Sequence, residues 1–284
     1  MATSEKESAL VSSEWLSRRL FDPGIRVVDG TYFLPTVARD AEKEFLARHI
    51  PGAVRFDIDE VKDQQNPLPH MLPSKEEFAE KAGALGLGEE AMIIAYDATG
   101  LSSAARVWWM FRVFGHERVA VLDGGLPKWV KEGRPLAADP AKAKRALFTP
   151  RFRPELLASL ERVREELKSG SAQILDARSA GRFSGREREF RAGLKSGHMP
   201  GALNLPYLEL FSPEGTLLPL DKVSERFRRA GVDLERPVTA SCGSGVTACV
   251  LALALFLLGK EKAAVYDGSW SEWGGREDTE ILAD

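Results

Sequence analysis

The chain of 284 residues carries the same pattern twice. Three segments of the first half recur in the second: HIPGAVRFDIDEV (49–61) as HMPGALNLPYLEL (198–210), AYDATGLSSAA (95–105) as ASCGSGVTACV (240–250), and VLDGGLPKW (121–129) as VYDGSWSEW (265–273). The offsets between the paired segments are 149, 145 and 144 residues. An offset that drifts so little over the whole length indicates one duplicated domain and excludes a solenoid of many small units.

The region between the copies has the character of a linker. Residues 135–154 contain four prolines and show no sustained hydrophobic periodicity. We therefore expect an N-terminal domain over residues 1–136, a linker over 137–156 and a C-terminal domain over 157–284.

Within each copy, short apolar runs alternate with helical patterns. The predicted strands are 25–28, 53–56, 92–95 and 119–122 in the first copy and 173–175, 202–205, 238–240 and 263–266 in the second. Helices are predicted over 74–84, where Ser74 and Glu77 have capping-box spacing, and over 246–258, before Gly259. This alternation predicts an α/β fold in which each domain has a parallel sheet with helices on both faces. Ligands bind such folds at the carboxyl ends of strands, here the loops 97–102 and 242–247.

The composition narrows the class of protein. There are 39 Lys and Arg against 42 Asp and Glu, a formal charge of -3, so the balance disfavours nucleic acid as a partner. The longest apolar run, 248–258, is shorter than the roughly 20 residues that span a bilayer. Because the first residues resemble neither a signal peptide nor a transit peptide, we expect a cytoplasmic protein without a membrane partner, although a presequence already removed would leave no trace. We find neither metal-ligand spacing nor a phosphate-binding loop, and we expect no metal and no cofactor.

Cys242 stands where a predicted strand ends and a helix begins. Gly243 and Gly245 allow the backbone to curl so that successive N–H groups face inward, and the helix adds the positive end of its dipole. This setting favours a thiolate nucleophile and would equally hold a second anionic sulfur bonded to it. The alternative is a small buried packing residue, which we disfavour because we expect a cysteine at such a turn to be accessible. For Cys249, inside the apolar helix, core packing is favoured over a resolving thiol.

The loop CGSGVTA, in the second of two duplicated α/β domains, resembles the active-site loop of the 3-mercaptopyruvate sulfurtransferases of the tandem-rhodanese family. The likeness extends over nearly the whole chain, including the HIPGA and HMPGA segments and the DGG and DGS turns. Thiosulfate sulfurtransferases of the same family typically carry basic residues after the cysteine, where this chain has Gly243 and Ser244. Rhodanese-like phosphatases need a longer loop and an arginine six residues after the cysteine, where this chain has Ala248. In the first copy Asp97 takes the place of Cys242, and the resemblance implies an inactive N-terminal domain.

An anionic donor requires cationic side chains that orient it. Arginine suits a carboxylate because its planar guanidinium binds two oxygens at once. The segment GRFSGREREFRAG supplies Arg182, Arg186, Arg188 and Arg191. The resemblance assigns Arg182 and Arg191 to the carboxylate and carbonyl of the substrate, whereas Arg186 and Arg188 are expected to be solvated and to pair with neighbouring glutamates.

Proton transfer is expected to involve a histidine. His49 and His198 occupy equivalent places in the two copies, which indicates a shared structural role, and His116 resembles a surface cap. His70 aligns with Thr216 and so has no counterpart in the second copy, as expected of a residue that the first copy contributes to the other's site. The resemblance implies a relay of Ser244, His70 and Asp59, and an ordinary loop histidine is the alternative.

The resemblance therefore implies sulfur transfer from 3-mercaptopyruvate through a Cys242 persulfide to a thiol acceptor such as thioredoxin or a small thiol, or to cyanide, with release of pyruvate. The backbone of Gly243, Gly245, Val246 and Thr247 would hold the transferred sulfur. Two alternatives stay open: a thiosulfate sulfurtransferase, and a rhodanese-like relay module that receives its persulfide from a protein and catalyses little. Arg182 and Arg191 argue against the relay, because a protein donor needs no carboxylate clamp.

Overall fold

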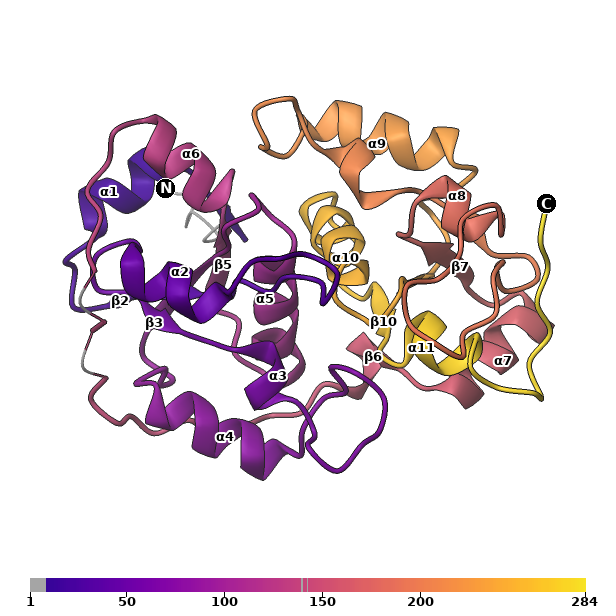
Figure 1. The fold of residues 1–284 in the computed structure, drawn as a ribbon, viewed down its shortest axis with the longest axis horizontal. Helices are drawn as coiled ribbons and strands as arrows, with labels where there is room; N and C mark the ends of the chain where they lie inside the picture. The colour runs from indigo at the N-terminus through magenta and orange to yellow at the C-terminus, as the bar shows by residue number, and fades with distance from the viewer. Residues whose placement is uncertain (1–8, 139, 142) are drawn as a thin grey trace, which may run out of the picture. The chain divides into compact units, whose positions relative to one another are not determined.

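The computed structural model describes residues 9–138, 140–141 and 143–284 (Figure 1). Internal contacts divide the chain into two compact units. The first unit comprises the chain up to Val61, Ser74–Phe152 and Pro213–Thr216, and the second comprises Lys62–Pro73, Arg153–Ser212 and Leu217–Asp284. Each unit thus includes one short segment from the other half of the sequence. The domain boundaries at residues 136 and 157 stay predictions.

Each unit is built on a five-stranded parallel sheet. The first sheet has the order β1-β5-β4-β2-β3 and contains β1 (Leu10–Val11), β2 (Ile25–Asp29), β3 (Val54–Arg55), β4 (Met92–Tyr96) and β5 (Val119–Leu122). The second has the order β6-β10-β9-β7-β8 and contains β6 (Leu157–Ala158), β7 (Gln173–Asp176), β8 (Leu203–Asn204), β9 (Val238–Ser241) and β10 (Ala264–Tyr266). The identical order confirms the duplication and the predicted α/β class.

Helices cover both faces of the first sheet (Figure 1). They are α1 (Ser13–Arg19), α2 (Ala41–Ala47), α3 (Ile58–Val61), α4 (Lys75–Ala84), α5 (Ser103–Val113) and α6 (Gly125–Lys131). Leu16 of α1, Phe45 of α2 and Trp129 of α6 pack in one apolar cluster on the sheet. A second, aromatic cluster joins Phe78 of α4 to Phe111 of α5, whose ring centroids lie 5.1 Å apart.

The second unit repeats this plan with different helix lengths. Its helices are α7 (Leu160–Ser169), α8 (Ala180–Phe183), α9 (Leu220–Arg229), α10 (Ala248–Leu257) and α11 (Ser269–Trp273), with short 3-10 turns at Pro154–Leu156 and Tyr207–Leu210. Val163 of α7 and Trp270 of α11 pack in one cluster with Ile174 of β7. Helix α10 is apolar on every side, and its residues 248–255 are buried. It therefore lies within the core of this unit, which fixes the loop before it.

Local sequence signals account for the helix ends that we predicted. Ser74 and Glu77 form the expected capping box at the start of α4: the Ser74 hydroxyl accepts from the Glu77 N–H at 3.2 Å, and the Glu77 carboxylate accepts from the Ser74 N–H at 3.0 Å. Helix α10 ends just before Gly259, which has a φ of 83°.

Three histidines outside the proposed site have structural roles. His49 and His198 each stack on a phenylalanine, Phe45 and Phe183, at centroid distances of 4.3 and 4.1 Å, and each Nδ1 lies close to the carbonyl oxygen of that phenylalanine. The equivalent pair thus has the shared structural role that we expected. The expectation for His116 was wrong: it is buried, with Nε2 3.1 Å from the carbonyl oxygens of both Ala91 and Arg118. Among the described residues, no helix is long and apolar enough to cross a membrane.

Candidate active site

The loop 242–247 connects strand β9 to helix α10 in the second unit. Its first carbonyl groups are held by α11: the Trp270 N–H donates to the Cys242 carbonyl at 3.0 Å, and the N–H and hydroxyl of Ser271 both donate to the Gly243 carbonyl, at 2.9 and 2.7 Å. Gly245 has a φ of 74°, a left-handed conformation that favours glycine. Within the described part of the chain, the N–H groups of Gly243, Ser244 and Thr247 have no hydrogen-bond acceptor. They can therefore bind an anion.

Cys242 itself is buried, with 1% of its surface exposed. Our expectation that a cysteine at this turn would be accessible was wrong. The backbone of the loop is also held from α11 and Ser269 by hydrogen bonds. Burial alone does not separate a nucleophile from a packing residue.

Ser269 is a residue of this loop that the sequence analysis missed. Its hydroxyl accepts hydrogen bonds from the N–H groups of Cys242 and Gly245, both at 3.1 Å, and donates to the Tyr266 carbonyl at 2.7 Å. The residue is fully buried and has a φ of 49°, which is unfavourable for a side chain larger than hydrogen. A signal was available, since Ser269 aligns with Gly125, the second glycine of the DGG turn, whose φ is 52°.

The equivalent loop of the first unit shows what this backbone can bind. Asp97 takes the place of the cysteine and is completely buried. Its carboxylate accepts hydrogen bonds from four backbone N–H groups, those of Thr99, Gly100, Ser102 and Ala104, at 2.7 to 2.9 Å, and from the Thr99 hydroxyl at 2.6 Å. In the first copy, this strand-to-helix turn is therefore a cradle for an anion, filled by a side chain of the chain itself.

Two guanidinium groups lie beside the cysteine loop. A methyl group added to Gly243 would lie 3.0 Å from Arg182 Nη2 and 3.8 Å from Arg191 Nη1. Arg191 Nη2 also donates to the Ser244 hydroxyl at 3.2 Å. Both guanidinium groups lie over the ring of Phe190, at 4.8 Å from its centroid. The structure therefore brings together Gly243 and the two arginines that the sequence singled out, whereas Arg186 and Arg188 are exposed.

A buried ion network supports Arg182. Glu189 Oε2 accepts from Arg182 Nη2 at 2.5 Å, and Glu189 Oε1 accepts from Arg178 Nη1 at 2.7 Å. Arg178 also binds the carboxylate of Asp176 and lies 4.1 Å from the centroid of the Trp270 ring. Burial alone would lower the pKa of Arg178, but the Asp176 and Glu189 carboxylates raise it on balance. We had expected Glu189 to pair with solvated arginines, and this was wrong, because its side chain is 1% exposed.

His70 lies in the segment Lys62–Pro73, which belongs to the second unit. It is buried, and its Nδ1 lies 3.0 Å from the Ser244 hydroxyl and 3.3 Å from the Ser244 carbonyl. Its φ of 62° is rare for a side chain of this size and indicates a conformation imposed by the surroundings. Two residues on, the Leu72 N–H donates to the Asp267 carboxylate at 2.7 Å, which fixes the segment to the turn after β10.

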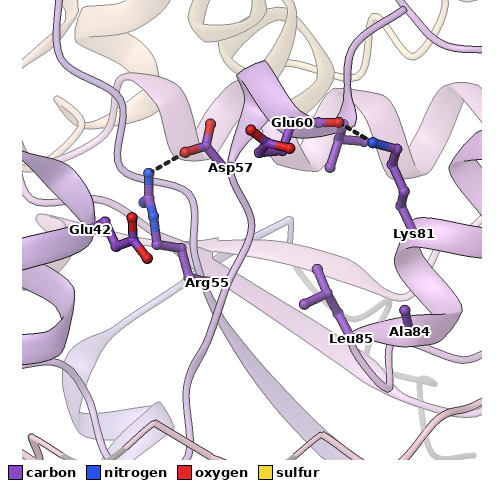
Figure 2. A pocket seen from close by; sticks show the side chains of 8 residues that line it. Glu42, Arg55, Asp57, Glu60, Lys81, Ala84 and Leu85 are labelled. Atoms are coloured by element: carbon purple, nitrogen blue, oxygen red, sulfur yellow. Dashed lines mark hydrogen bonds and ion pairs between the residues drawn. The ribbon is translucent and has the colours of Figure 1, made fainter. Parts of the chain in front are cut away.

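Asp59, the third residue of the expected relay, lies in α3 of the first unit. It lines a cavity of about 350 Å³ together with Arg55 and Asp57. A larger cavity of the same unit, about 510 Å³, is lined by Arg55, Asp57, Glu60 and Lys81 (Figure 2). Two of its lining residues, Arg55 and Asp57, form an ion pair at 2.7 Å, and the lining includes neither a cysteine nor a serine.

Cys249 is fully buried in α10, and its thiol donates to the Gly245 carbonyl at 3.1 Å. This position agrees with the packing role that we favoured for it. In the part of the chain that the structure describes, no three or more His, Cys, Asp or Glu side chains are grouped to hold a metal ion.

Comparisons with known proteins identify the family of the chain. The model of the rhodanese-like domain matches twice, over residues 12–132 and 159–276. The chain is 43% identical to human 3-mercaptopyruvate sulfurtransferase, over 96% of this chain and 94% of that protein. It is 44% identical to chicken thiosulfate sulfurtransferase, over 93% of each. The crystal structure of SseA from Escherichia coli, described with the rhodanese fold of 3-mercaptopyruvate sulfotransferases, superposes with a TM-score of 0.85 at 40% identity, covering 93% of this chain and 99% of that one. The chain therefore belongs to the rhodanese family and is a sulfurtransferase with two rhodanese-like domains.

Proposed function

We propose that the chain moves the sulfur of 3-mercaptopyruvate through a persulfide on Cys242 to a thiol acceptor, with release of pyruvate. The observation that carries the choice of donor is the position of Arg182 and Arg191 against Gly243 of the cysteine loop. A small α-keto acid presents a carboxylate and a carbonyl oxygen, and two guanidinium groups beside the nucleophile can bind both. The N-terminal copy, with Asp97 in place of the cysteine, does not catalyse transfer.

In the first half of the reaction, the Cys242 thiolate attacks the sulfur of the donor. A sulfur–sulfur bond forms, and the bond between that sulfur and C3 of the donor breaks. Its electron pair passes to C3 and gives the enolate of pyruvate, which takes up a proton to become pyruvate. The products are the Cys242 persulfide and pyruvate, and no external oxidant or reductant is needed.

The loop backbone stabilises the persulfide anion. The N–H groups of Ser244 and Thr247 are the counterparts of those of Thr99 and Ser102, which bind the Asp97 carboxylate in the first copy. Together with the N–H of Gly243, they are proposed to stabilise the anion in a low-dielectric site, where a fixed donor is worth more than in water. Gly245, whose N–H binds the Ser269 hydroxyl, and Val246 shape the backbone of the loop. The Asp97 carboxylate of the first copy thus occupies the position that we propose for the persulfide anion on Cys242 in the second copy.

Ser244, His70 and Asp59 are proposed to transfer the proton between the attacking thiol and the departing enolate. The contact between Ser244 and His70 Nδ1 supports a path from the donor to the imidazole, and the Asp59 carboxylate is proposed to orient the histidine. An imidazole can both accept and donate a proton, so the group that activates the incoming thiol can also protonate the departing enolate.

In the second half of the reaction, an acceptor thiolate attacks the outer sulfur. The bond between the two sulfurs of the persulfide breaks, and the electron pair returns to Cys242 as its thiolate. We propose a cytoplasmic thiol acceptor such as thioredoxin or a small thiol, and cyanide takes the same role in an assay. The covalent intermediate predicts ping-pong kinetics with parallel initial-rate lines.

Thiosulfate is the alternative donor, and a thiosulfate sulfurtransferase is among the full-length relatives of the chain. The uncharged residues Gly243 and Ser244 favour mercaptopyruvate, because a dianion such as thiosulfate gains more from basic residues in the loop.

The test is the intact mass of the protein after brief incubation with each donor, for the wild type and for Cys242→Ser. We expect a gain of one sulfur, about 32 daltons, on the wild type only and preferentially from mercaptopyruvate, together with pyruvate release. A preference for thiosulfate would assign the chain to the sister activity. No adduct from either donor would support the relay module, and an adduct on Cys242→Ser would exclude Cys242 as the carrier.

A further inference from the structure

The arginines beside the cysteine loop and the carboxylates that pair with them have a small net charge. Asp176, Arg178, Glu189 and Arg182 form one continuous ion network of two carboxylates and two guanidinium groups, so its formal charge is zero. Arg191 contacts the Ser244 hydroxyl and the Phe190 ring, and no carboxylate of the described residues lies within ion-pair distance of it. The basic groups next to the loop therefore present a net charge of one.

Glu189 determines this value. Its side chain is 1% exposed and bridges Arg178, which is fully buried, and Arg182, which is 19% exposed. Both oxygens are used: Oε1 accepts from Arg178 Nη1 at 2.7 Å and from Arg182 Nε at 3.2 Å, and Oε2 accepts from Arg182 Nη2 at 2.5 Å. Since Asp176 already neutralises Arg178, the Glu189 carboxylate neutralises Arg182.

We propose that Glu189 is the specificity-determining residue of the site, because it cancels the charge of Arg182 and leaves one net positive charge, which selects monoanionic sulfur donors over dianionic ones. This inference rests on the proposed function, in which Arg182 and Arg191 contact the donor. 3-Mercaptopyruvate carries one negative charge and thiosulfate carries two. Glu189 also fixes the guanidinium plane of Arg182, so it acts through that arginine as a positioning residue.

The proposal predicts how much the preference between the two donors should change when the Glu189 charge is removed. Replacing Glu189 by glutamine keeps the size of the side chain and raises the net charge from one to two. At an effective dielectric constant of about 20, one additional unit charge within roughly 10 Å of the donor favours a dianion over a monoanion by a factor on the order of ten. The ratio of kcat/KM for thiosulfate to that for mercaptopyruvate should therefore rise about tenfold in Glu189→Gln.

Two control variants separate charge from structure. Glu187→Gln removes an equal charge from the same loop, where the Glu187 carboxylate is exposed and accepts from the Ser179 hydroxyl at 2.8 Å, and it should leave the ratio unchanged. Glu189→Asp keeps the charge but shortens the side chain, so it should lower kcat while the ratio stays that of the wild type. Equal losses with both donors in a folded Glu189→Gln protein would overturn the proposal, because a merely structural role predicts that result.

A measurement on the wild type decides the matter if Glu189→Gln does not fold. Methanesulfonate and sulfate share a tetrahedral shape but carry one and two negative charges. A site with one net positive charge should be inhibited by methanesulfonate at least as well as by sulfate, and a tenfold preference for sulfate would overturn the proposal. The outcomes also separate the two claims: if the wild type uses both donors but prefers thiosulfate and the ratio still rises in Glu189→Gln, the donor assignment fails, whereas the effect of the Glu189 charge stands.

Discussion

His70 Nδ1 lies 3.0 Å from the hydroxyl oxygen of Ser244, although 174 residues separate the two in the chain. The contact joins a residue of the first sequence copy to the cysteine loop of the second, inside one compact unit. The unusual φ of His70 shows that the surrounding segment holds it there against its own backbone preference.

Replacing His70 by glutamine should slow persulfide formation from mercaptopyruvate by about a hundredfold, because general acid catalysis of enolate departure is lost. Thiosulfate serves as the internal control: its leaving group, sulfite, departs as an anion and needs no proton. Single-turnover rates with both donors measure the difference. Ser244→Ala should show the same bias, and the double variant should lose little more than either single one, since the two residues act as a unit. Equal slowing with both donors would exclude the proton-transfer role.

Replacing Ser269 by alanine should lower the free energy of unfolding by about 2 kcal/mol, because the buried N–H groups of Cys242 and Gly245 lose their common acceptor. Urea denaturation measures the change. The matched control is Ser271→Ala, where the Gly243 carbonyl keeps the N–H of residue 271 as a donor, and the expected loss is about 1 kcal/mol. A smaller loss in Ser269→Ala than in Ser271→Ala would contradict the role assigned to Ser269.

Replacing Asp97 by asparagine should destabilise the first unit by about 3 kcal/mol, because one amide oxygen cannot accept the hydrogen bonds that two carboxylate oxygens accept now. Persulfide formation on Cys242 at a temperature where the variant is folded should be unchanged. Asp22→Asn is the control: its carboxylate accepts only the Gly24 N–H in an exposed turn, so the expected change is small. A similar stability of both variants would argue against the anion cradle.

Acidification should destabilise the protein through His116. Burial lowers the pKa of His116 below its ordinary value of 6.5, and the neutral ring donates its Nε2 proton to carbonyl groups of the first unit. As the pH falls below 6.5, the unfolded chain takes up a proton that the folded chain resists, so the free energy of unfolding falls until the folded pKa is passed. Urea denaturation between pH 5 and 7.5 should show a flatter dependence for His116→Gln than for the wild type. Identical slopes would show that other groups cause the dependence.

The fold could be predicted from the sequence because the strands and helix ends of each domain depend on residues that are close together in the chain. All eight predicted strands exist, with ends that shift by at most one residue. The two strands that were missed, β1 and β6, are two residues long and lie at the edge of their sheets, so they contain no alternation to detect. The capping box of α4 depends on two residues three positions apart and was therefore predictable.

The site was harder to predict, because burial in irregular loops follows no period. Arg178 and the side chain of Glu189 are buried, whereas Arg186 and Arg188 are exposed. Nothing in the sequence of this segment distinguishes the buried charges from the exposed ones. His116 was misplaced for the same reason, since a histidine after a helix can face solvent or turn back to backbone carbonyls. The cysteine loop was predictable in position but not in burial, because its backbone is bonded to α11 and Ser269, which lie more than twenty residues further along the chain.

The exchange of short segments between the two halves limits how the protein can be divided. A fragment that begins at Arg153 would contain Cys242, both arginines and the complete second sheet. It would lack Lys62–Pro73, so the Asp267 carboxylate would lose the Leu72 N–H and Ser244 would lose His70. The two copies that gene duplication produced can therefore no longer be separated at the linker without loss of these contacts, and recombination or domain shuffling at that point would give a second domain whose cysteine loop lacks the contact with His70.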